Sequence, residues 1–275
     1  MKIFKSEKFP KMEVSLYDAT LNPRNVIAFS YLECIEDRHL MYPSEITREE
    51  ATKITEWVLK GGHTPSLESI HLCFNIRGIS RIVSHQLVRH RIGVSIDQRT
   101  QRANCKEYLG RFYRGKHFIL PPSFNNLPNV KNGVTQALHN LFCNAEIVYN
   151  LLVENGISED DARYVIPHGA ETSMNFKVIY KALMHMCSVR LCSVMQGEII
   201  EITRLMKMAV DEYDELLGSW LKPTCAITGI CNRNENNPNN ENPKGVCHFT
   251  IDGTVPARKR DDTFSLTKFS KDGTK

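Results

Sequence analysis

The sequence predicts an α+β fold in which helices dominate and one sheet is present. Two short stretches alternate apolar and polar residues, which is the pattern of strands with one buried face. Several longer stretches place apolar residues three or four apart, which is typical of helices. Hydrophobic residues make up 41% of the 275 residues, enough to form a core.

The two strands are expected at residues 13–18 and 70–77. In the second, the apolar residues from Ile70 to Ile76 occupy every other position, so its two faces differ sharply. Residues 94–118 are expected to form a loop with a short strand. The sequence shows no internal repeat.

The starts of the helices are marked by residues that satisfy the free N–H groups of a first turn. Pro23 follows Asn22 at the first start, where proline is tolerated. Thr47 is followed three residues later by Glu50, the pattern of a capping box, and Ser158 precedes a short helix. Helices are expected at residues 22–35, 47–59, 79–91, 134–154, 159–164, 176–186 and 192–217.

Composition and charge narrow the class of protein. The formal net charge of +4 is mild for a protein that coats DNA. No stretch approaches the roughly 20 apolar residues that cross a bilayer, and residues 1–12 are too polar for a secretory signal. Nine cysteines then indicate mostly reduced thiols. We therefore expect a cytoplasmic protein that has neither a membrane nor a nucleic acid as its partner.

Residues 1–225 are expected to form one domain, and residues 226–275 a polar, partly disordered tail. In and beside this tail, Cys225, Cys231 and Cys247-His248 could offer zinc three thiolates and one imidazole. Their spacing lacks the usual close pair, so we favour free thiols and expect no metal site.

The most informative stretch runs from Ser80 to Arg102 and holds five arginines, two histidines and one acid, Asp97. Arginine suits phosphate because its planar fork donates two hydrogen bonds at once, and a glutamine such as Gln86 can read the edge of a pyrimidine. The stretch could also be a solvated basic face or a nucleic-acid patch. However, small and apolar residues interrupt it, unlike a run of lysines.

A helix over residues 79–91 would sort these side chains onto two faces. Gln86 lies three residues before Arg89 and four before His90, so the three are expected to share one face. The opposite, core-facing side would hold Ile79, Val83 and Leu87.

A second set of basic residues lies downstream. Lys181 and His185 are four residues apart and are expected on one helix face. Arg163 and Arg190 each stand among apolar neighbours, where a buried guanidinium needs an anionic partner. That partner is either an acid such as Glu198 on a neighbouring helix or the phosphate of a ligand, and the residues alone leave both open.

Taken together, these segments resemble the flavin-dependent thymidylate synthases. Arg89-His90-Arg91 is similar to the signature triplet of that family, and further motifs follow the family's order over roughly residues 14–225. These motifs are Gly62 to Glu68, Ser80-Arg81, His85 to Val88, Ser95, Gln98, Gln101-Arg102, Ala162 to Pro167, Leu183 to Arg190 and Gln196 to Ile199.

The resemblance implies the family's fold, which is helix-rich around a central, mostly antiparallel sheet. It implies FAD as cofactor, NADPH as reductant and methylenetetrahydrofolate as one-carbon donor in the reductive methylation of dUMP to dTMP, a step of nucleotide biosynthesis. It also implies a homotetramer with active sites at subunit interfaces. Because the cofactor carries the hydride, the protein has to align its ligands and stabilise developing charge, and no cysteine nucleophile is required.

The resemblance also implies roles for individual residues, carried over by matching position. The residues expected to contact FAD are His63, Arg89, His90, Arg91, Gln98, Lys181 and His185. Those expected to hold the nucleotide are Gln86, Arg89, Thr100, Gln101, Arg102, Arg163 and Arg190. Within these sets, the catalytic residues are expected to be Arg89, Arg190 and Thr100.

The chain departs from the family's pattern near the expected nucleotide site. Eight residues, from Ile92 to Arg99, separate Arg91 from Thr100, one more than usual, and Ala103 replaces a tyrosine. Two other functions therefore stay open. One is a divergent relative that modifies another pyrimidine nucleotide at C5, and the other is a nucleic-acid-binding module.

Overall fold

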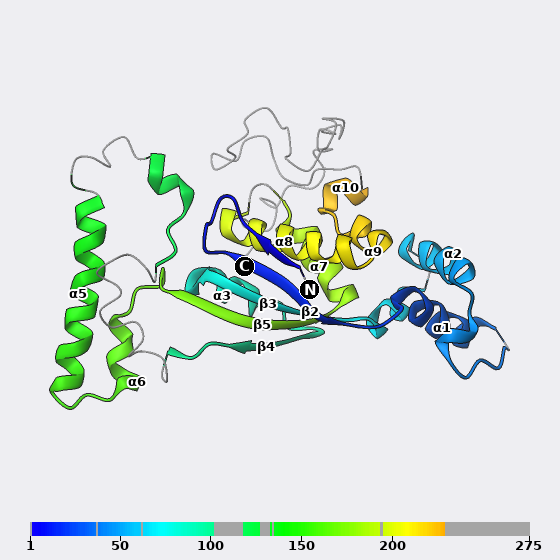
Figure 1. Ribbon diagram of the computed structural model, residues 1–275, viewed down its shortest axis with the longest axis horizontal. Helices are drawn as coiled ribbons and strands as arrows, with labels where there is room; N and C mark the ends of the chain where they lie inside the picture. Colours follow the sequence, from blue (N-terminus) through cyan, green and yellow to red (C-terminus); the bar gives the residue numbers. More distant parts are fainter. Residues whose placement is uncertain are drawn as a thin grey trace, which may run out of the picture.

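The computed structural model describes residues 2–36, 38–61, 63–101, 118–126, 133, 135–192 and 195–228. A five-stranded sheet lies at its centre, several helices cover one face of the sheet, and a helical pair projects from each end (Figure 1). The α+β prediction, with helices dominant around one sheet, is confirmed.

All neighbouring strands of the sheet are antiparallel, as the family resemblance implied. The strands are β1 (Ile3–Lys5), β2 (Glu13–Ala19), β3 (His71–Ser80), β4 (Val94–Gln98) and β5 (Glu171–Ile179), in the sheet order β1-β2-β3-β5-β4. Although β5 is last in sequence, it enters between β3 and β4. The segments before and after β5 therefore lie at opposite ends of this strand.

The position of β5 corrects the prediction of a helix over residues 176–186. Residues 176–179 are the end of a strand in which Met174, Phe176 and Val178 are buried and alternate with polar residues. Phe176 pairs with Phe74 of β3, so a distant partner decides its conformation. No glycine or proline separates β5 from the following helix, which is why the helical pattern appeared to begin too early. The short strand β1 was also missed.

The helix starts follow the capping residues. Thr47 Oγ1 accepts a hydrogen bond from Glu50 N at 3.2 Å, while the Glu50 carboxylate binds Arg38 at 2.6 Å instead of completing the capping box. The helices are α1 (Pro23–Ile35), α2 (Arg48–Leu59), α3 (Arg81–Leu87), α5 (Thr135–Glu154), α6 (Glu159–Ala162), α7 (Tyr180–Arg190), α8 (Gly197–Tyr213), α9 (Glu215–Trp220) and α10 (Thr224–Thr228), with 3-10 helices η1 (Pro43–Glu45), η2 (Thr64–Ser69), η4 (Pro122–Asn126) and η6 (Arg163–Val165).

The single helix predicted over residues 192–217 is two helices, α8 and α9, which meet at Asp214. This residue has an extended backbone, and its carboxylate accepts from Leu217 N at 3.1 Å to cap α9. The same carboxylate binds Arg24 of α1 through two contacts of 2.8 and 3.0 Å. The break is therefore stabilised by a contact that a local pattern cannot reveal.

The core lies between the sheet and α8. Ile199, Ile202 and Leu205 line the buried side of α8 and belong to one cluster with Phe74 and Phe176 of the sheet. Each of these side chains is fully buried, which stabilises the fold by about 1.5–3 kcal/mol per side chain. This packing fixes the strands and helices that carry the basic residues.

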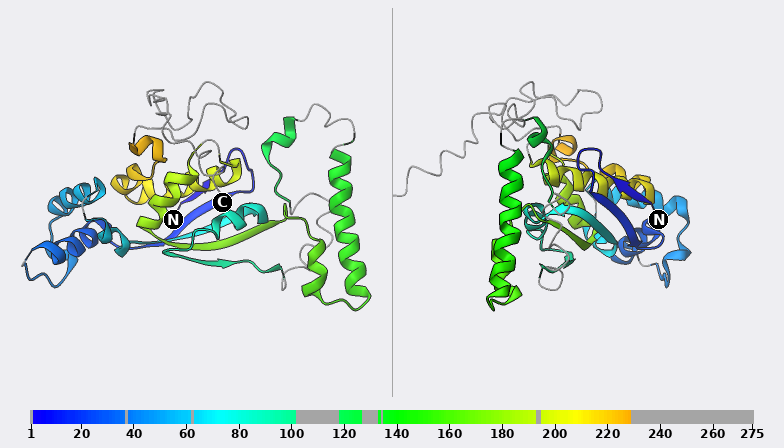
Figure 2. Two further views of the ribbon diagram at one scale, coloured as in Figure 1. Left: turned by 180° about the vertical axis from the view of Figure 1, so that it is seen from behind. Right: turned by 60° about the vertical axis from the view of Figure 1, so that its left-hand side comes forward.

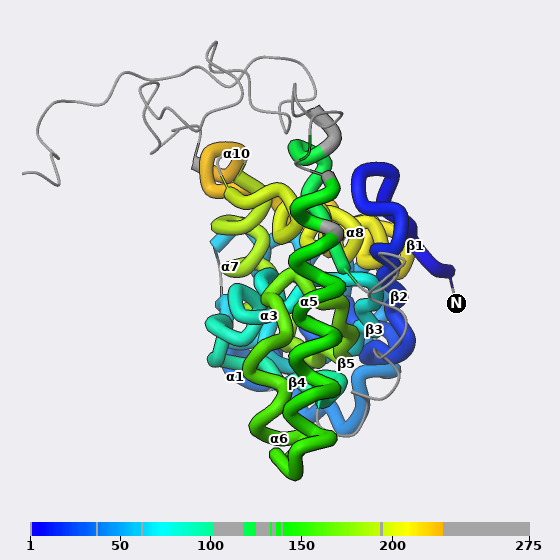
Figure 3. The backbone as a smooth tube through the Cα atoms, turned by 90° about the vertical axis from the view of Figure 1, so that its left-hand side faces the viewer, coloured from blue at the N-terminus to red at the C-terminus, as the bar shows by residue number. Residues whose placement is uncertain are grey.

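Helix α5 lies beside α6 at one end of the molecule, and α1 and α2 lie at the other (Figures 2 and 3). One face of α5 packs on α6 and η6, whereas Leu141, Ile147, Val148 and Leu151 stay 42–54% exposed. We call these four residues the α5 stripe. No helix among the described residues is long and apolar enough to cross a membrane.

Candidate functional site

The signature triplet lies in a turn after α3, not on the helix. Helix α3 begins after Ser80, whose Oγ accepts from Val83 N at 3.1 Å, and ends at Leu87. His90 N then bonds Leu87 O at 3.0 Å, which closes a tighter turn. The prediction that Gln86, Arg89 and His90 share one helix face was therefore wrong, because the helix ends between them.

The apolar side of this segment was predicted correctly. Val83 and Leu87 are fully buried on α3, as expected. Ile79 is also buried, but it belongs to β3 and not to the helix. The core contact of α3 thus fixes where the triplet turn begins.

Gly93 holds the triplet turn against the junction between β5 and α7. Its φ is +66°, and a Cβ atom there would meet Ile179 Cγ1 at 2.4 Å and the Ala182 side chain at 3.3 Å. Gly93 O also accepts from Ile179 N at 2.9 Å. Only glycine combines this conformation with so close an approach. The turn therefore runs alongside α7.

Three of the predicted site residues come together where the turn meets α7. Arg190 Nε donates to His90 Nε2 at 3.1 Å across 100 residues of sequence. Burial, then the nearby Arg190 and His185, lower the pKa of His90 to about 4. His90 is thus neutral near pH 7, and its Nε2 lone pair can accept the bond from Arg190.

The acid considered as a partner for Arg190 lies elsewhere. Both oxygens of Glu198 bind Ser80, one to its N–H and one to its hydroxyl, each at 2.6 Å. Next to the cluster, Arg89 and Arg91 are exposed, and neither forms an ion pair within the described part of the chain. The turn therefore presents two guanidinium groups to an incoming anion.

The residues that follow β4 lie at the other end of this strand. Gln98 donates to Thr172 Oγ1 at 3.4 Å, so its side chain turns toward the start of β5. Thr100 is exposed and Gln101 is half-buried. Arg102 and Ala103 lie outside the described residues.

Arg163 is separated from the cluster within one chain. It lies in η6, before β5, whereas Arg190 ends α7, after β5 (Figure 1). Its Nε donates to Asp160 O at 2.9 Å and its Nη2 lies 3.7 Å from the Asp160 carboxylate. The single pocket expected to unite Arg163 with Arg190 is not formed by one copy of the chain.

His63 and Lys181 also lie apart from the triplet contacts. The His63 ring lies 6.2 Å from that of Tyr31 on α1. Lys181 forms an ion pair with Glu68 at 2.7 Å, which joins α7 to η2. Lys181 therefore keeps its expected place on α7 beside His185, with an acid already bound.

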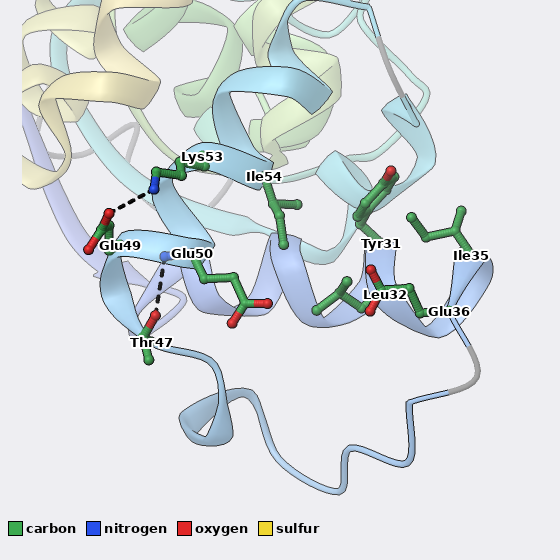
Figure 4. A pocket seen from close by; sticks show the side chains of 9 residues that line it. All are labelled: Tyr31, Leu32, Ile35, Glu36, Thr47, Glu49, Glu50, Lys53 and Ile54. Atoms are coloured by element: carbon green, nitrogen blue, oxygen red, sulfur yellow. Dashed lines mark hydrogen bonds and ion pairs between the residues drawn. The ribbon is translucent and has the colours of Figure 1, made fainter.

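A cavity of about 420 Å³ opens between α1 and α2 (Figure 4). Tyr31, Leu32 and Ile54 form part of its lining, and none of the predicted site residues does. Two of its three lining acids are engaged by bases, Glu49 by Lys53 at 2.7 Å and Glu50 by Arg38 at 2.6 Å. This cavity is separate from the triplet cluster.

No group of three or more metal-ligating side chains occurs among the residues the structure describes. Cys225 forms no disulfide within the described part of the chain, while Cys231, Cys247 and His248 lie outside the described residues. The proposed absence of a metal in the tail stays a prediction.

The family model described as thymidylate synthase complementing protein matches residues 15–214. The chain belongs to this family. The chain is 28% identical over 233 residues to a flavin-dependent thymidylate synthase of Clostridium tetani, covering 80% of this chain and 90% of the relative. It is 34% identical over 187 residues to the one from Saccharolobus solfataricus, covering 67% of each.

The fold agrees with the family. The crystal structure of thymidylate synthase X (ThyX) from Helicobacter pylori with FAD and dUMP has a TM-score of 0.57 at 20% identity, covering 77% of this chain and 99% of that one. At this identity the likeness shows the shared fold. The prediction that the chain is an enzyme of the flavin-dependent thymidylate synthase family is confirmed.

Proposed function

We propose that the chain methylates dUMP to dTMP reductively, with FAD as cofactor, methylenetetrahydrofolate as one-carbon donor and NADPH as reductant. The observation that carries the proposal is the cluster of His90, His185 and Arg190 beside the exposed Arg89 and Arg91, in a chain of this family. When bound, FAD would supply the hydride, and the residues of the chain would align the ligands.

The triplet turn suits FAD chemically. Arg89 and Arg91 offer paired N–H donors to the pyrophosphate oxygens without an acid to displace among the described residues. No glycine-rich loop at a helix start is then required. The other proposed FAD contacts, which come from the surrounding elements, are His63, His90, Gln98, Lys181 and His185.

The nucleotide would lie against Arg190. His90 fixes the Arg190 guanidinium through Nε, which orients the planar fork for a phosphate or carbonyl oxygen. We propose that Arg89, Arg190 and Thr100 act on the reacting pyrimidine by stabilising the negative charge that develops there. The remaining proposed nucleotide contacts are Gln86, Gln101, Arg102 and Arg163.

A homotetramer would explain why Arg163 lies apart from Arg190. A second copy could bring its Arg163 to the His90–Arg190 cluster, so that two chains form one site. The α5 stripe supports association, because its four large apolar side chains are 42–54% exposed in one copy of the chain. The stripe lies on the same end of the molecule as Arg163 (Figure 1).

The nucleic-acid-binding alternative finds less support. Several basic side chains near the site are already paired with acids: Lys177 with Asp97 at 2.9 Å, and Lys181 with Glu68 at 2.7 Å. These pairs interrupt the continuous basic surface that a duplex would need. A cytoplasmic location also stays a proposal, supported by the six described cysteines, none of which is in a disulfide.

One spectroscopic experiment tests the proposed reaction. The purified protein should be yellow, and its flavin should bleach when NADPH is added without oxygen. Adding methylenetetrahydrofolate with dUMP should then restore the oxidised spectrum and yield dTMP. Reoxidation with dCMP or UMP in place of dUMP would identify a different pyrimidine substrate, and a colourless protein that does not bind FAD would contradict the proposal.

A further inference from the structure

Glu198 is a buried acid that the proposed reaction does not use. Its side chain is 3% exposed, near the start of α8. Oε1 accepts from Ser80 N and Oε2 accepts from the Ser80 hydroxyl, each at 2.6 Å. Burial raises the pKa of Glu198, while the hydrogen bonds from Ser80 and Gln196 oppose this rise. Burying a carboxyl group is unfavourable unless its oxygens are hydrogen-bonded, so these bonds to Ser80 indicate a structural role for Glu198.

The partner of Glu198 controls the start of α3. Ser80 is the last residue of β3 and the N-cap of α3, and its Oγ accepts from Val83 N at 3.1 Å. Because the Ser80 hydroxyl donates its hydrogen bond to Glu198, a lone pair of its oxygen is free to accept from Val83 N at the start of the helix. Glu198 thereby fixes both the backbone and the side chain of the residue from which α3 grows.

The other end of the same segment is tied to the same part of the chain. The triplet follows α3, and its His90 is bound by Arg190, which lies eight residues before Glu198. The segment from Ser80 to His90 is thus held at its first residue by Glu198 and at its last by Arg190. A shift of α3 at Ser80 would be transmitted to His90 through one short helix, which is anchored in the core by Val83 and Leu87.

We propose that Glu198 is a positioning residue, which through Ser80 sets the place of α3 and so aligns the Arg89-His90-Arg91 turn with Arg190. The role of that turn in binding FAD rests on the proposed function. The alignment itself concerns only the protein and can be measured without any ligand.

Helix α8 supplies a matched control one turn later. Glu201 is also 3% exposed, but its carboxylate accepts from Ser6 Oγ at 2.7 Å and from Arg204 at 2.7 and 3.0 Å. Desolvation opposes ionisation of Glu201, yet the bonds from Arg204 and Ser6 hold its pKa below the ordinary value. Glu201 thus anchors the loop between β1 and β2, and these hydrogen bonds run to Ser6 and Arg204 instead of to Ser80.

The experiment compares Glu198→Gln with Glu201→Gln in the full chain. The amide of Glu198→Gln can still accept from Ser80 N but leaves the hydroxyl proton of Ser80 without its acceptor. Two readouts are taken for each variant: the pH titration of the His90 ring by NMR without ligands, and the Kd for FAD. Thermal unfolding reports general damage to the fold.

In Glu198→Gln the pKa of His90 should move from about 4 toward 6.5, because the contact with Arg190 loosens. FAD affinity should fall by about tenfold, and Tm should fall by a few degrees. Ser80→Ala should reproduce these effects. Ser80→Thr, which keeps a hydroxyl, should retain the wild-type values. The double variant Ser80→Ala with Glu198→Gln should be no worse than either single variant. Glu201→Gln should lower Tm but leave both site readouts as in the wild type.

The proposal is overturned if Glu198→Gln leaves the His90 titration unchanged, or if Glu201→Gln shifts it equally. If the wild type binds no FAD, the proposed function fails, and the His90 titration alone decides whether Glu198 positions the turn.

Discussion

The His90–Arg190 end of the molecule and the Arg163 end differ in how much of the expected site each builds. At the first, the triplet turn, α7 and Gly93 meet through hydrogen bonds and close packing. At the second, Arg163 contacts its neighbour Asp160, and the nearby α5 stripe is exposed. Under the proposed function, one chain would organise the FAD side of the site, and a second copy would complete the nucleotide side.

The largest expected effect concerns the α5 stripe. Leu141→Asp with Leu151→Asp should dissociate the oligomer, because burying two carboxylates in an apolar interface costs on the order of several kcal/mol. Light scattering after gel filtration measures the mass. Leu141→Met with Leu151→Met keeps apolar side chains at the same two positions and should leave the mass unchanged. A double stripe variant that keeps the wild-type mass would remove the stripe from the interface.

The second prediction tests the FAD side of the comparison. Gly93→Ala should disrupt the triplet turn, because its left-handed backbone disfavours alanine by about 1–2 kcal/mol and the added Cβ adds a clash of about 1–3 kcal/mol. FAD titration should show the loss. Gly156→Ala shares a positive φ of 85° but has open space around its Cβ, so FAD binding should be unaffected. Equal effects in the two variants would show that packing at Gly93 is unimportant.

The third prediction compares the two arginines directly. Arg163→Ala and Arg190→Ala should each weaken nucleotide binding by about 1–3 kcal/mol, the usual loss for a charge-assisted hydrogen bond. FAD binding should change less. Isothermal titration with dUMP measures the nucleotide affinity of each variant, and titration with FAD measures cofactor binding. Only Arg190→Ala should also raise the pKa of His90, since Arg163 is not its neighbour. Unchanged nucleotide affinity in both variants would contradict the assigned pocket.

The smallest effect concerns pH. His90 has a pKa of about 4 in the folded chain, below its ordinary 6.5, so the unfolded chain binds more protons between these values. Stability is therefore present above pH 6.5 and is lost as pH falls toward 4. Because His90 is partly exposed, we expect a loss on the order of 1–2 kcal/mol after solvent screening. Urea unfolding at pH 7 and 4.5 should show this loss in the wild type but not in His90→Gln. An equal loss of unfolding free energy between pH 7 and 4.5 in the two proteins would contradict this prediction.

The sequence predicted those features that depend on near neighbours. Thr47 and Ser158 cap helices as expected, and strands appear at 13–19 and 71–80 close to their predicted places. The triplet was recognised as part of a family motif, although its helix ends at Leu87. These features are set by backbone capping and by alternation along a few residues.

The features that were missed depend on distant partners. Strand β5 is defined by its pairing with β3, and the helix break at Asp214 depends on Arg24 of α1. The contact between His90 and Arg190 spans 100 residues, so no pattern in the neighbouring residues could predict it. Arg163 and Arg190 are separated because the extended strand β5 lies between them in the sequence, where the residues had in part predicted a helix.

Mixing the two impaired variants, assayed at a dUMP concentration below the Kd of either one, tests the shared site most directly. Arg163→Ala and Arg190→Ala are purified separately, unfolded together and refolded, and dTMP formation is measured against each variant refolded alone. If a site takes Arg163 from one copy and Arg190 from another, some sites in mixed oligomers hold both arginines, and activity should reappear. The account would be contradicted by a mixture that forms mixed oligomers and binds FAD, yet forms dTMP no faster than either variant refolded alone.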